Sequence, residues 1–296
     1  MSGSRRNMRA IVICGARRTG TTLMNQILCS DPGSHDQVGE ARLLAKFIEL
    51  FQWSEDNYEN VVQWYFKDEP TFRGFFEETL DRMLDHAVEV LSPGDKLILK
   101  TPTFSNAIDA TLALMPNTSV VVCVRSPFDQ IVSEYEVGLR QIEQGLKETN
   151  RASRRDFAGW ARIYASAYDQ ILAAAEAAPD RFYFVRYEDV IGKTAETLAD
   201  MERSLGLDLS SYDPEADWKN FKNREALEKM PANVPQYGAP LDASRVGRYT
   251  DVLKPEEVEA IRTICERAIT RFYPEDAAMA MEEPSRRKWP WQSRSS

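Results

Sequence analysis

The chain has 296 residues, enough to bury a sizeable core as one large domain, and with 43% hydrophobic and 28% charged residues its composition is globular. Its formal net charge of −9 argues against a general nucleic-acid binder, which would normally be basic. No stretch approaches the roughly 18 apolar residues of a membrane span, and the apolar run near the N-terminus is too short for a signal peptide. We therefore expect a soluble, cytoplasmic protein.

The four cysteines are widely spaced and form no C-x-x-C pair. All of them lie in apolar segments, which favours reduced, buried thiols over disulfides or zinc: Cys14, Cys29, Cys123 and Cys265. We expect no metal site.

Four apolar runs predict buried strands, at residues 10–14, 97–99, 119–124 and 182–185. The runs are continuous rather than alternating, as in parallel strands that are covered on both faces. Helical patterns lie between them: one over 23–28, one over 104–115, and one that starts at Pro127 with Ser126 as its N-cap. This alternation predicts an α/β fold, a P-loop-like parallel β-sheet of about four to five strands flanked by helices.

The segment "CGARRTGTT" joins the first predicted strand to the first predicted helix. Gly15 and Gly20 have the spacing of the nucleotide-binding motif G-x-x-x-x-G-K-[ST], but Thr21 stands in place of the lysine. Arg17 and Arg18 precede the second glycine instead. A glycine turn before a helix presents N–H groups and the positive end of the helix dipole to an anion. We expect Arg18 to supply the cation that the lysine would provide.

This loop resembles the R/K-[ST]-G-T loop of the sulfotransferase superfamily, which binds the 5′-phosphosulfate of PAPS (3′-phosphoadenosine 5′-phosphosulfate). A second signature of that family is an arginine at a strand end with a serine eight residues later, and Arg125 and Ser133 match it. By resemblance these two residues bind the 3′-phosphate of PAPS. Weaker similarity to bacterial and carbohydrate-type members extends over most of residues 9–272. The cofactor site that the resemblance implies consists of Arg17, Arg18, Thr19, Gly20, Thr21, Thr22, Arg125, Ser133 and Arg248.

Sulfuryl transfer needs a cation beside the leaving group and a base for the acceptor hydroxyl. Because the sulfonate carries less charge than a terminal phosphate, a metal is less necessary, and we expect none. Arg18 and Lys100, which ends a predicted strand, are the candidate cations. In similar sulfotransferases a Gly-Glu pair after the first helix supplies the base, which implies Glu40 here. His35 is the alternative base, because the unperturbed pKa of histidine suits proton transfer.

The predicted domain spans residues 9–275, with a disordered stretch at 1–8 and a flexible tail at 276–296. An aromatic-rich helical cap is expected at 47–95 and a lid-like loop at 222–250. The basic and aromatic tail is compatible with a membrane surface, but a solvated tail is the favoured interpretation.

The acceptor cannot be identified from the sequence beyond a hydroxyl on a glycan, a glycolipid or another small metabolite, with some aromatic rings of 47–80 as candidate contacts. The oligomeric state is left open. The alternative function is a P-loop kinase or nucleoside triphosphatase, which needs a lysine after Gly20 and an acidic residue at a strand end. A non-catalytic nucleotide-binding protein on the same fold is the third hypothesis.

Overall fold

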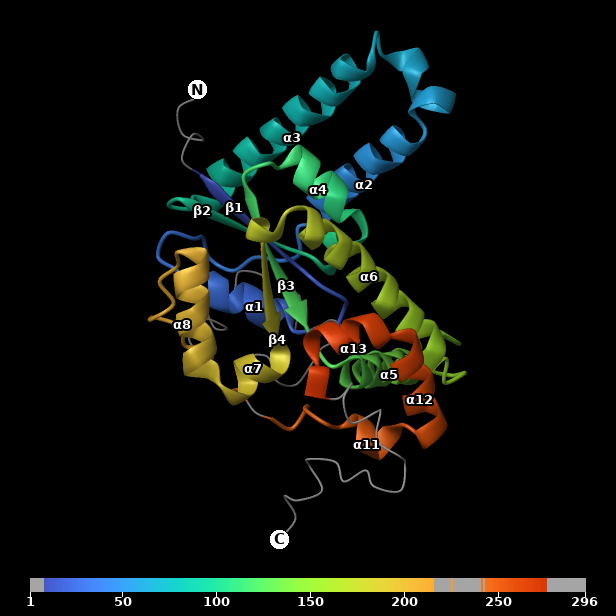
Figure 1. The fold of residues 1–296 in the computed structure, drawn as a ribbon. Coiled ribbons are helices and arrows are strands. Elements are labelled where there is room, and N and C mark those ends of the chain that lie inside the picture. Colours follow the sequence, from blue (N-terminus) through green and yellow to red (C-terminus); the bar gives the residue numbers. More distant parts are fainter. Residues whose placement is uncertain (1–7, 216–224, 226–240, 242, 276–296) are drawn as a thin grey trace.

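The computed structural model of the protein describes residues 8–215, 225, 241 and 243–275. In this part of the chain four parallel strands form one sheet in the order β2-β1-β3-β4 (Figure 1). Each strand coincides with a predicted apolar run, so the predicted parallel α/β sheet is confirmed. The strands are β1 (Arg9–Cys14), β2 (Lys96–Lys100), β3 (Thr118–Val124) and β4 (Phe182–Arg186).

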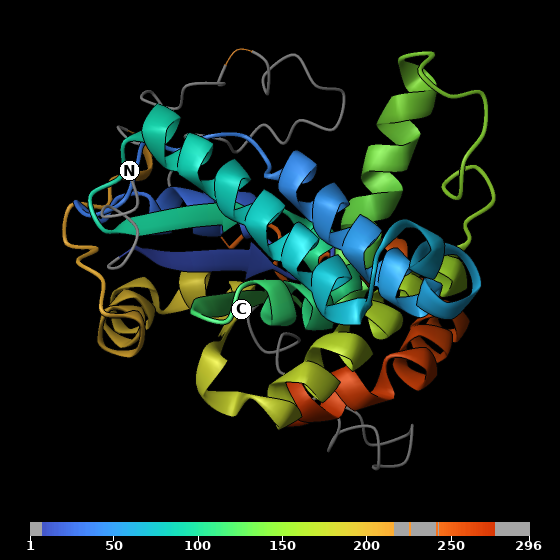
Figure 2. The same cartoon turned by 90° about the horizontal axis from the view of Figure 1, so that it is seen from above.

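Helices cover both faces of the sheet, as Figure 1 and Figure 2 show. The α-helices are α1 (Thr21–Leu28), α2 (Arg42–Asp56), α3 (Glu69–Leu91), α4 (Ile108–Leu114), α5 (Pro127–Glu143), α6 (Phe157–Ala177), α7 (Tyr187–Gly192), α8 (Thr194–Leu205), α11 (Tyr249–Val252), α12 (Pro255–Ile264) and α13 (Glu266–Phe272). Short helical turns are η1 (Tyr58–Val62), η2 (Gln63–Tyr65), η3 (Pro102–Ala107) and η4 (Pro179–Arg181). The helix predicted over 104–115 is therefore divided between η3 and α4.

Successive side chains of each strand point to opposite faces, and both faces are apolar. In β1, Ile11 and Ile13 pack with the cluster that contains residues of α1, α7 and α8. Val12 and Cys14 pack on the other face, in the larger cluster that includes α4 and α6. All four side chains are fully buried, which explains why the strand sequence is continuously apolar.

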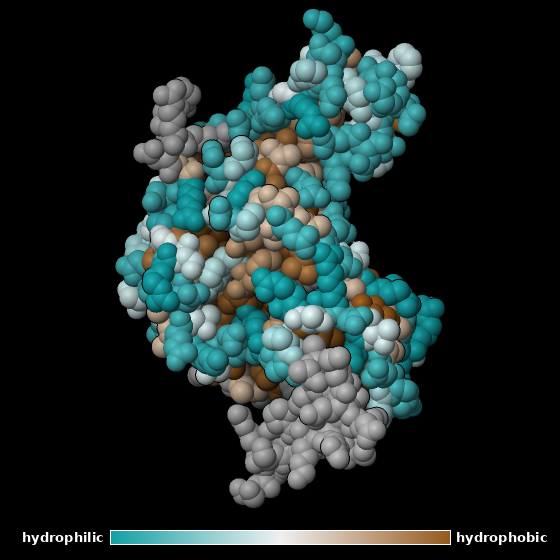
Figure 3. All heavy atoms as spheres, in the orientation of Figure 1, coloured by the Kyte–Doolittle hydropathy of each residue, from teal (hydrophilic) through white to brown (hydrophobic). Residues whose placement is uncertain are grey.

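Helices α2 and α3 form a hairpin that packs on the larger cluster at one end and projects from it at the other (Figure 1). Phe51, Phe72 and Phe76 are buried and contact one another, so these rings of the aromatic-rich segment are core. Trp64 and Tyr65 at the far end are about four-fifths exposed. Figure 3 shows that hydrophobic residues gather mainly over the middle of the molecule in this view rather than on the projecting end.

The free edge of β2 is covered by residues 33–41, which run alongside it. The Lys96 N–H donates to Gly33 O over 3.0 Å, and the Ala41 N–H donates to Lys100 O over 2.9 Å. Between these contacts, Nε2 of His35 lies 3.1 Å from Ile98 O. Covering an edge strand satisfies its backbone groups. It also fixes residue 40 beside the carboxyl end of β2.

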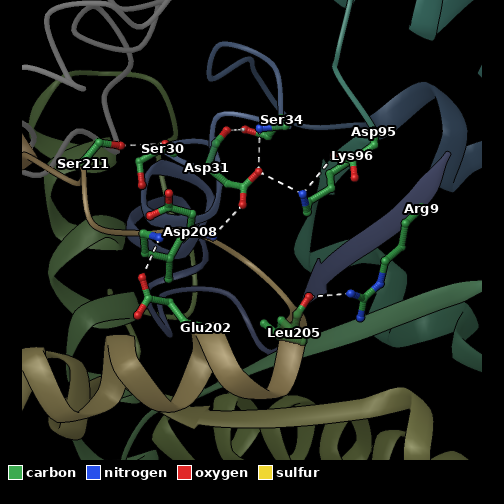
Figure 4. A network of polar contacts seen from close by, with 12 residues as sticks. Arg9, Ser30, Asp31, Ser34, Asp95, Lys96, Glu202, Leu205, Asp208 and Ser211 are labelled. Atoms are coloured by element: carbon green, nitrogen blue, oxygen red, sulfur yellow. Dashed lines mark hydrogen bonds and ion pairs between the residues drawn. The ribbon is translucent and has the colours of Figure 1, made fainter. Parts of the chain in front are cut away.

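At the amino end of the sheet a polar network joins the ends of α1 and α8 to the strands (Figure 4). The Asp31 carboxylate accepts from the Asp208 N–H over 2.7 Å and pairs with Lys96 Nζ at 3.2 Å. Arg9 donates to Leu205 O and, over 2.8 Å, to the Ser119 hydroxyl. Asp31 is almost fully buried, so these contacts replace its hydration.

The predicted start of α5 is confirmed, with Ser126 at the N-cap and Pro127 at the first helical position. The Ser126 side chain, however, makes no capping hydrogen bond. Most of the predicted lid at 222–250, residues 1–7 and the tail 276–296 lie outside the described residues. None of the described helices is long and apolar enough to cross a membrane.

Candidate active site

The loop between β1 and α1 requires its two glycines. Gly15 has φ +130°, and a Cβ there would lie 2.3 Å from Cys123 O. Gly20 has φ +90°, and a Cβ there would lie 2.9 Å from the ring of Tyr187. Arg18 also lies in the left-handed region, with φ +67°, which costs energy for a residue with a side chain. The backbone is thus held in a tight turn before α1.

Carbonyl groups of this loop point toward the protein. The Arg17 carbonyl accepts from Gln130 Nε2 over 2.7 Å, and the Arg18 carbonyl accepts from Arg125 Nη1 over 3.2 Å. Because C=O and N–H point in opposite directions across a trans peptide, the next N–H groups, of Arg18 and Thr19, point away from this scaffold. Outward N–H groups beside a helix N-terminus are the arrangement with which proteins commonly bind anions.

The threonines of the loop have different roles. Thr19 is buried, and its hydroxyl donates to Ala16 O over 2.7 Å, which stabilises the turn itself. Thr21 is also buried, at the first position of α1. Thr22 is half-buried, and its hydroxyl lies 3.3 Å from Lys100 Nζ.

Lys100 and Glu40 form an ion pair beside Thr22, with 3.2 Å between Nζ and Oε1. Arg42 Nε lies 2.6 Å from the other carboxylate oxygen. Burial raises the pKa of Glu40, but the charges of Lys100 and Arg42 outweigh it, so the pKa is lowered from 4.5. Burial lowers the pKa of Lys100, and Glu40 opposes that shift. Lys100 is 6% exposed, so its ammonium is held inside the site and not in solvent.

The two predicted phosphate-binding signatures meet in space. Arg18 Nε donates to the Ser133 hydroxyl over 3.3 Å. Arg125 lies below the loop, 7% exposed, with its guanidinium carbon 4.7 Å from the centre of the Tyr187 ring. Arg125 Nη2 donates to Arg245 O over 2.7 Å, whereas its buried Nε has no partner among the described residues.

Two buried carboxylates stabilise the backbone around the site, and the sequence analysis did not place them there. Asp129 accepts from the N–H groups of Gly247 and Tyr249 over 2.6 and 3.0 Å. Glu188 accepts from the N–H of Ser126 over 2.9 Å, at the N-terminus of α5. Burial raises the pKa of both carboxyls. The only sequence signal for Asp129 is its position in the first turn of α5, where acidic residues are common.

Other predicted residues lie at the border of the site. The Arg17 side chain is two-thirds exposed and pairs with Glu134 at 3.5 Å. Arg248 pairs with Glu136 at 2.7 Å on the outer side of α5. His35 is buried against the backbone of Ile98. The described residues contain no cluster of three or more His, Cys, Asp or Glu able to hold a metal ion.

A cavity of about 360 Å³ lies beside the loop, between η3, α5 and α6. No residue of the aromatic-rich segment 47–95 lines it. Its aromatic wall comes from α6, a helix that the sequence analysis did not connect with the site. The lining residues are Gly15, Ala16, Arg17, Pro102, Thr103, Ser105, Asn106, Gln130, Glu134, Val137, Gly138, Gln141, Lys147, Asn150, Arg151, Trp160, Ile163, Tyr164 and Ala167.

Three solved structures of sulfotransferases are similar to this fold, each at 16% identity. The sulfotransferase domain of the Synechococcus PCC 7002 olefin synthase has a TM-score of 0.53, and the superposition covers 87% of this chain and 94% of that domain. The sulfotransferase domain from the curacin biosynthetic pathway has a TM-score of 0.52, with 88% and 98% covered. Sulfotransferase STF9 from Mycobacterium avium has a TM-score of 0.52, with 90% and 77% covered.

No curated protein matches the chain. The model of the sulfotransferase family, in contrast, matches residues 10–211, which include the loop, Glu40, Lys100, Arg125 and Ser133. This match covers more than half of the chain, whereas the solved structures, at their low identity, support the fold alone. The chain therefore belongs to the sulfotransferase family, and it is a PAPS-dependent transferase.

Proposed function

We propose that the protein transfers the sulfuryl group of PAPS to the hydroxyl of a small-molecule, glycan or lipid acceptor, with Glu40 as general base and Arg18 and Lys100 as the catalytic cations. The observation that carries this proposal is the contact of Lys100 with both Glu40 and Thr22 at the N-terminus of α1. It unites a base, a cation and an anion-binding helix terminus in one place.

The chain's own groups fit the two anionic ends of PAPS. The N–H groups of the loop, Arg18 and the N-terminus of α1 suit the 5′-phosphosulfate. Arg125 and Ser133 suit the 3′-phosphate, because the buried Nε of Arg125 has no partner among the described residues. Arg17, Thr19, Gly20, Thr21 and Arg248 belong to the proposed binding surface as supports of the loop or border residues.

PAPS, when bound, supplies the sulfuryl group and leaves as the 3′,5′-bisphosphate. Glu40 accepts the proton of the acceptor hydroxyl, whose oxygen bonds to sulfur as the bond from sulfur to the bridging oxygen breaks. Once Glu40 is protonated, its ion pair with Lys100 is lost. The Lys100 ammonium then stabilises the negative charge that develops on the bridging oxygen, together with Arg18.

The position of Lys100 also weighs against a nucleoside triphosphatase. In a P-loop the hydroxyl two residues after the second glycine, here that of Thr22, holds Mg²⁺. Lys100 Nζ lies 3.3 Å from this hydroxyl, so an ammonium takes the place next to it. The strand β3, moreover, is followed by Arg125 and not by an acidic residue. We therefore expect transfer without added metal.

His35 is the weaker candidate for the base. Its ring nitrogens face the backbone oxygens of Asp36 and Ile98, at 2.8 and 3.1 Å, where they close the edge of β2. Glu40 lies against Lys100 instead, so its carboxylate adjoins the loop.

The proposed function is tested by incubating the protein with PAPS labelled in its sulfuryl group and a panel of hydroxyl acceptors, with and without EDTA. We expect a labelled sulfate ester and stoichiometric bisphosphate product, unchanged by EDTA. A reaction that stops with EDTA, resumes with Mg²⁺ and consumes ATP would contradict the proposal.

A further inference from the structure

The length of the cavity beside the loop can be estimated along α5, which forms one of its walls. Its wall on this helix runs from Gln130, which contacts the loop backbone, to Gln141. These residues are separated by eleven helical positions, or about 16 Å at 1.5 Å per residue. One end of the cavity therefore adjoins the loop, while the other opens near the segment 147–151.

The charges of the lining are predominantly positive, although the whole chain carries a net charge of −9. At the loop end Arg17 is paired with Glu134. At the outer end Arg151 is paired with Asp156, which does not line the cavity. The ammonium of Lys147 has no ion-pair partner within the described part of the chain, and the residue is exposed at the cavity border.

Between the two charged ends the wall combines polar side chains, such as Asn106 and Glu134, with apolar ones. Val137 of α5 and Trp160 and Ile163 of α6 are among its apolar lining residues. Ile163 is 54% exposed, so its side chain is accessible to a ligand in the cavity. These apolar side chains can stabilise an apolar ligand segment by removing it from water.

We propose that this cavity binds the acceptor, and that the preferred acceptor is an amphiphile with its hydroxyl at the loop end, an apolar middle and an anionic group that Lys147 attracts at the outer end. The proposal rests on the proposed function, because it assigns the hydroxyl to the end of the cavity next to the transfer site. The apolar middle matches Val137, Trp160 and Ile163, and the length of the cavity places the anionic group about 12–16 Å from the hydroxyl.

Three probes of equal chain length test this assignment: 12-hydroxydodecanoate, its neutral methyl ester and 12-hydroxydodecyl phosphate. Binding of each is measured by calorimetry in the presence of the 3′,5′-bisphosphate product, so that the readout does not depend on transfer. We expect the carboxylate and the phosphate to bind about tenfold more tightly than the ester. Equal binding of the ester, or binding of the acids only when the bisphosphate is absent, would overturn the proposal.

The residue assignment is tested with Lys147→Glu, and Lys67→Glu on the turn before α3 is the matched control, because Lys67 is exposed and does not line the cavity. Lys147→Glu should weaken binding of the two acids about five- to tenfold and change binding of the ester less than twofold. The control should change none of the three. Equal weakening of acids and ester by Lys147→Glu would contradict the role of this ammonium.

The two proposals fail in different ways. Lys147-dependent binding of the acids without any labelled product supports the cavity assignment and contradicts sulfuryl transfer. Labelled product formed equally well from acid and ester supports transfer and contradicts the cavity assignment.

Discussion

The two ends of the sheet use charge in opposite ways. At the amino end, Asp31 is nearly surrounded by donors, among them Lys96 and the Asp208 N–H (Figure 4). At the carboxyl end, the buried guanidinium of Arg125 hydrogen bonds to backbone carbonyl groups of Arg18 and Arg245 and lies on an aromatic ring. Arg125 forms no salt bridge among the described residues, although its charge favours the ionised forms of the nearby Asp129 and Glu188 carboxyls. Its unpartnered Nε remains a donor for an anion, whereas the paired charge of Asp31 serves the fold.

The largest effect should come from the carboxyl end. Glu40→Gln preserves the size of the side chain but removes the proton acceptor, so kcat should fall by on the order of 10²–10⁴. Binding of the bisphosphate product, measured by calorimetry, should change less than threefold, since Arg18, Arg125 and Ser133 are intact. Near-parental turnover of this variant would show that the base lies elsewhere.

Substitution at the amino end should lower stability and leave turnover nearly unchanged. Asp31→Ala removes the carboxylate from a buried network and leaves the Asp208 N–H and Lys96 with fewer partners, which should lower the free energy of unfolding by about 3 kcal/mol. Denaturant titration measures this loss. At denaturant concentrations below the unfolding transition, kcat should stay within threefold of the parent value. A large loss of kcat in the folded variant would contradict the different roles assigned to the two ends of the sheet.

Substitution of His35, which contacts the middle of β2, tests whether this position serves stability or catalysis. His35→Ala removes the ring that covers Ile98, so it should destabilise the protein by about 1–2 kcal/mol through lost backbone hydrogen bonding. Turnover at 25 °C should fall less than threefold. A dead but fully folded variant would assign the base to His35 and contradict Glu40.

The smallest effect concerns pH. The pKa of Glu40 is lowered from 4.5, so the catalytically competent carboxylate is present above this value, and kcat/KM should fall only as the pH drops below 4.5. Arg42 contributes to the lowering, and its side chain is 71% exposed. Arg42→Ala should therefore move this acid limb upward by less than about 1 pH unit. An unmoved limb would show that another group controls it.

Features that depend on short segments could be predicted from the sequence alone. The four strands are continuous apolar runs, and the loop residues Gly15, Arg18 and Gly20 are recognisable because an anion-binding turn needs them at fixed spacing. Lys100 and Glu40 were identified separately, one from its strand end and one by resemblance. Their contact follows from residues 33–41 running along β2, which no local pattern shows.

Features made by distant segments were not predictable. Asp129 anchors residues 247–249, far along the chain, and nothing near it in the sequence indicates that partner. The contact of a few aromatic rings of 47–80 with the acceptor stays a prediction, while Phe51 and Phe72 are core. The cavity proposed for the acceptor lies between α5 and α6, so its existence depends on tertiary packing.

Arg125 provides the most direct test of the claim that the carboxyl end is built for PAPS. Calorimetry compares binding of the 3′,5′-bisphosphate with binding of AMP, which lacks the 3′-phosphate, in the parent protein and in Arg125→Ala. A buried guanidinium–phosphate pair is worth about 2–4 kcal/mol, so we predict that the parent prefers the bisphosphate by about 30-fold or more and that the variant loses most of this preference. A parent protein that binds both nucleotides equally, or a variant that keeps the full preference, would contradict the central claim.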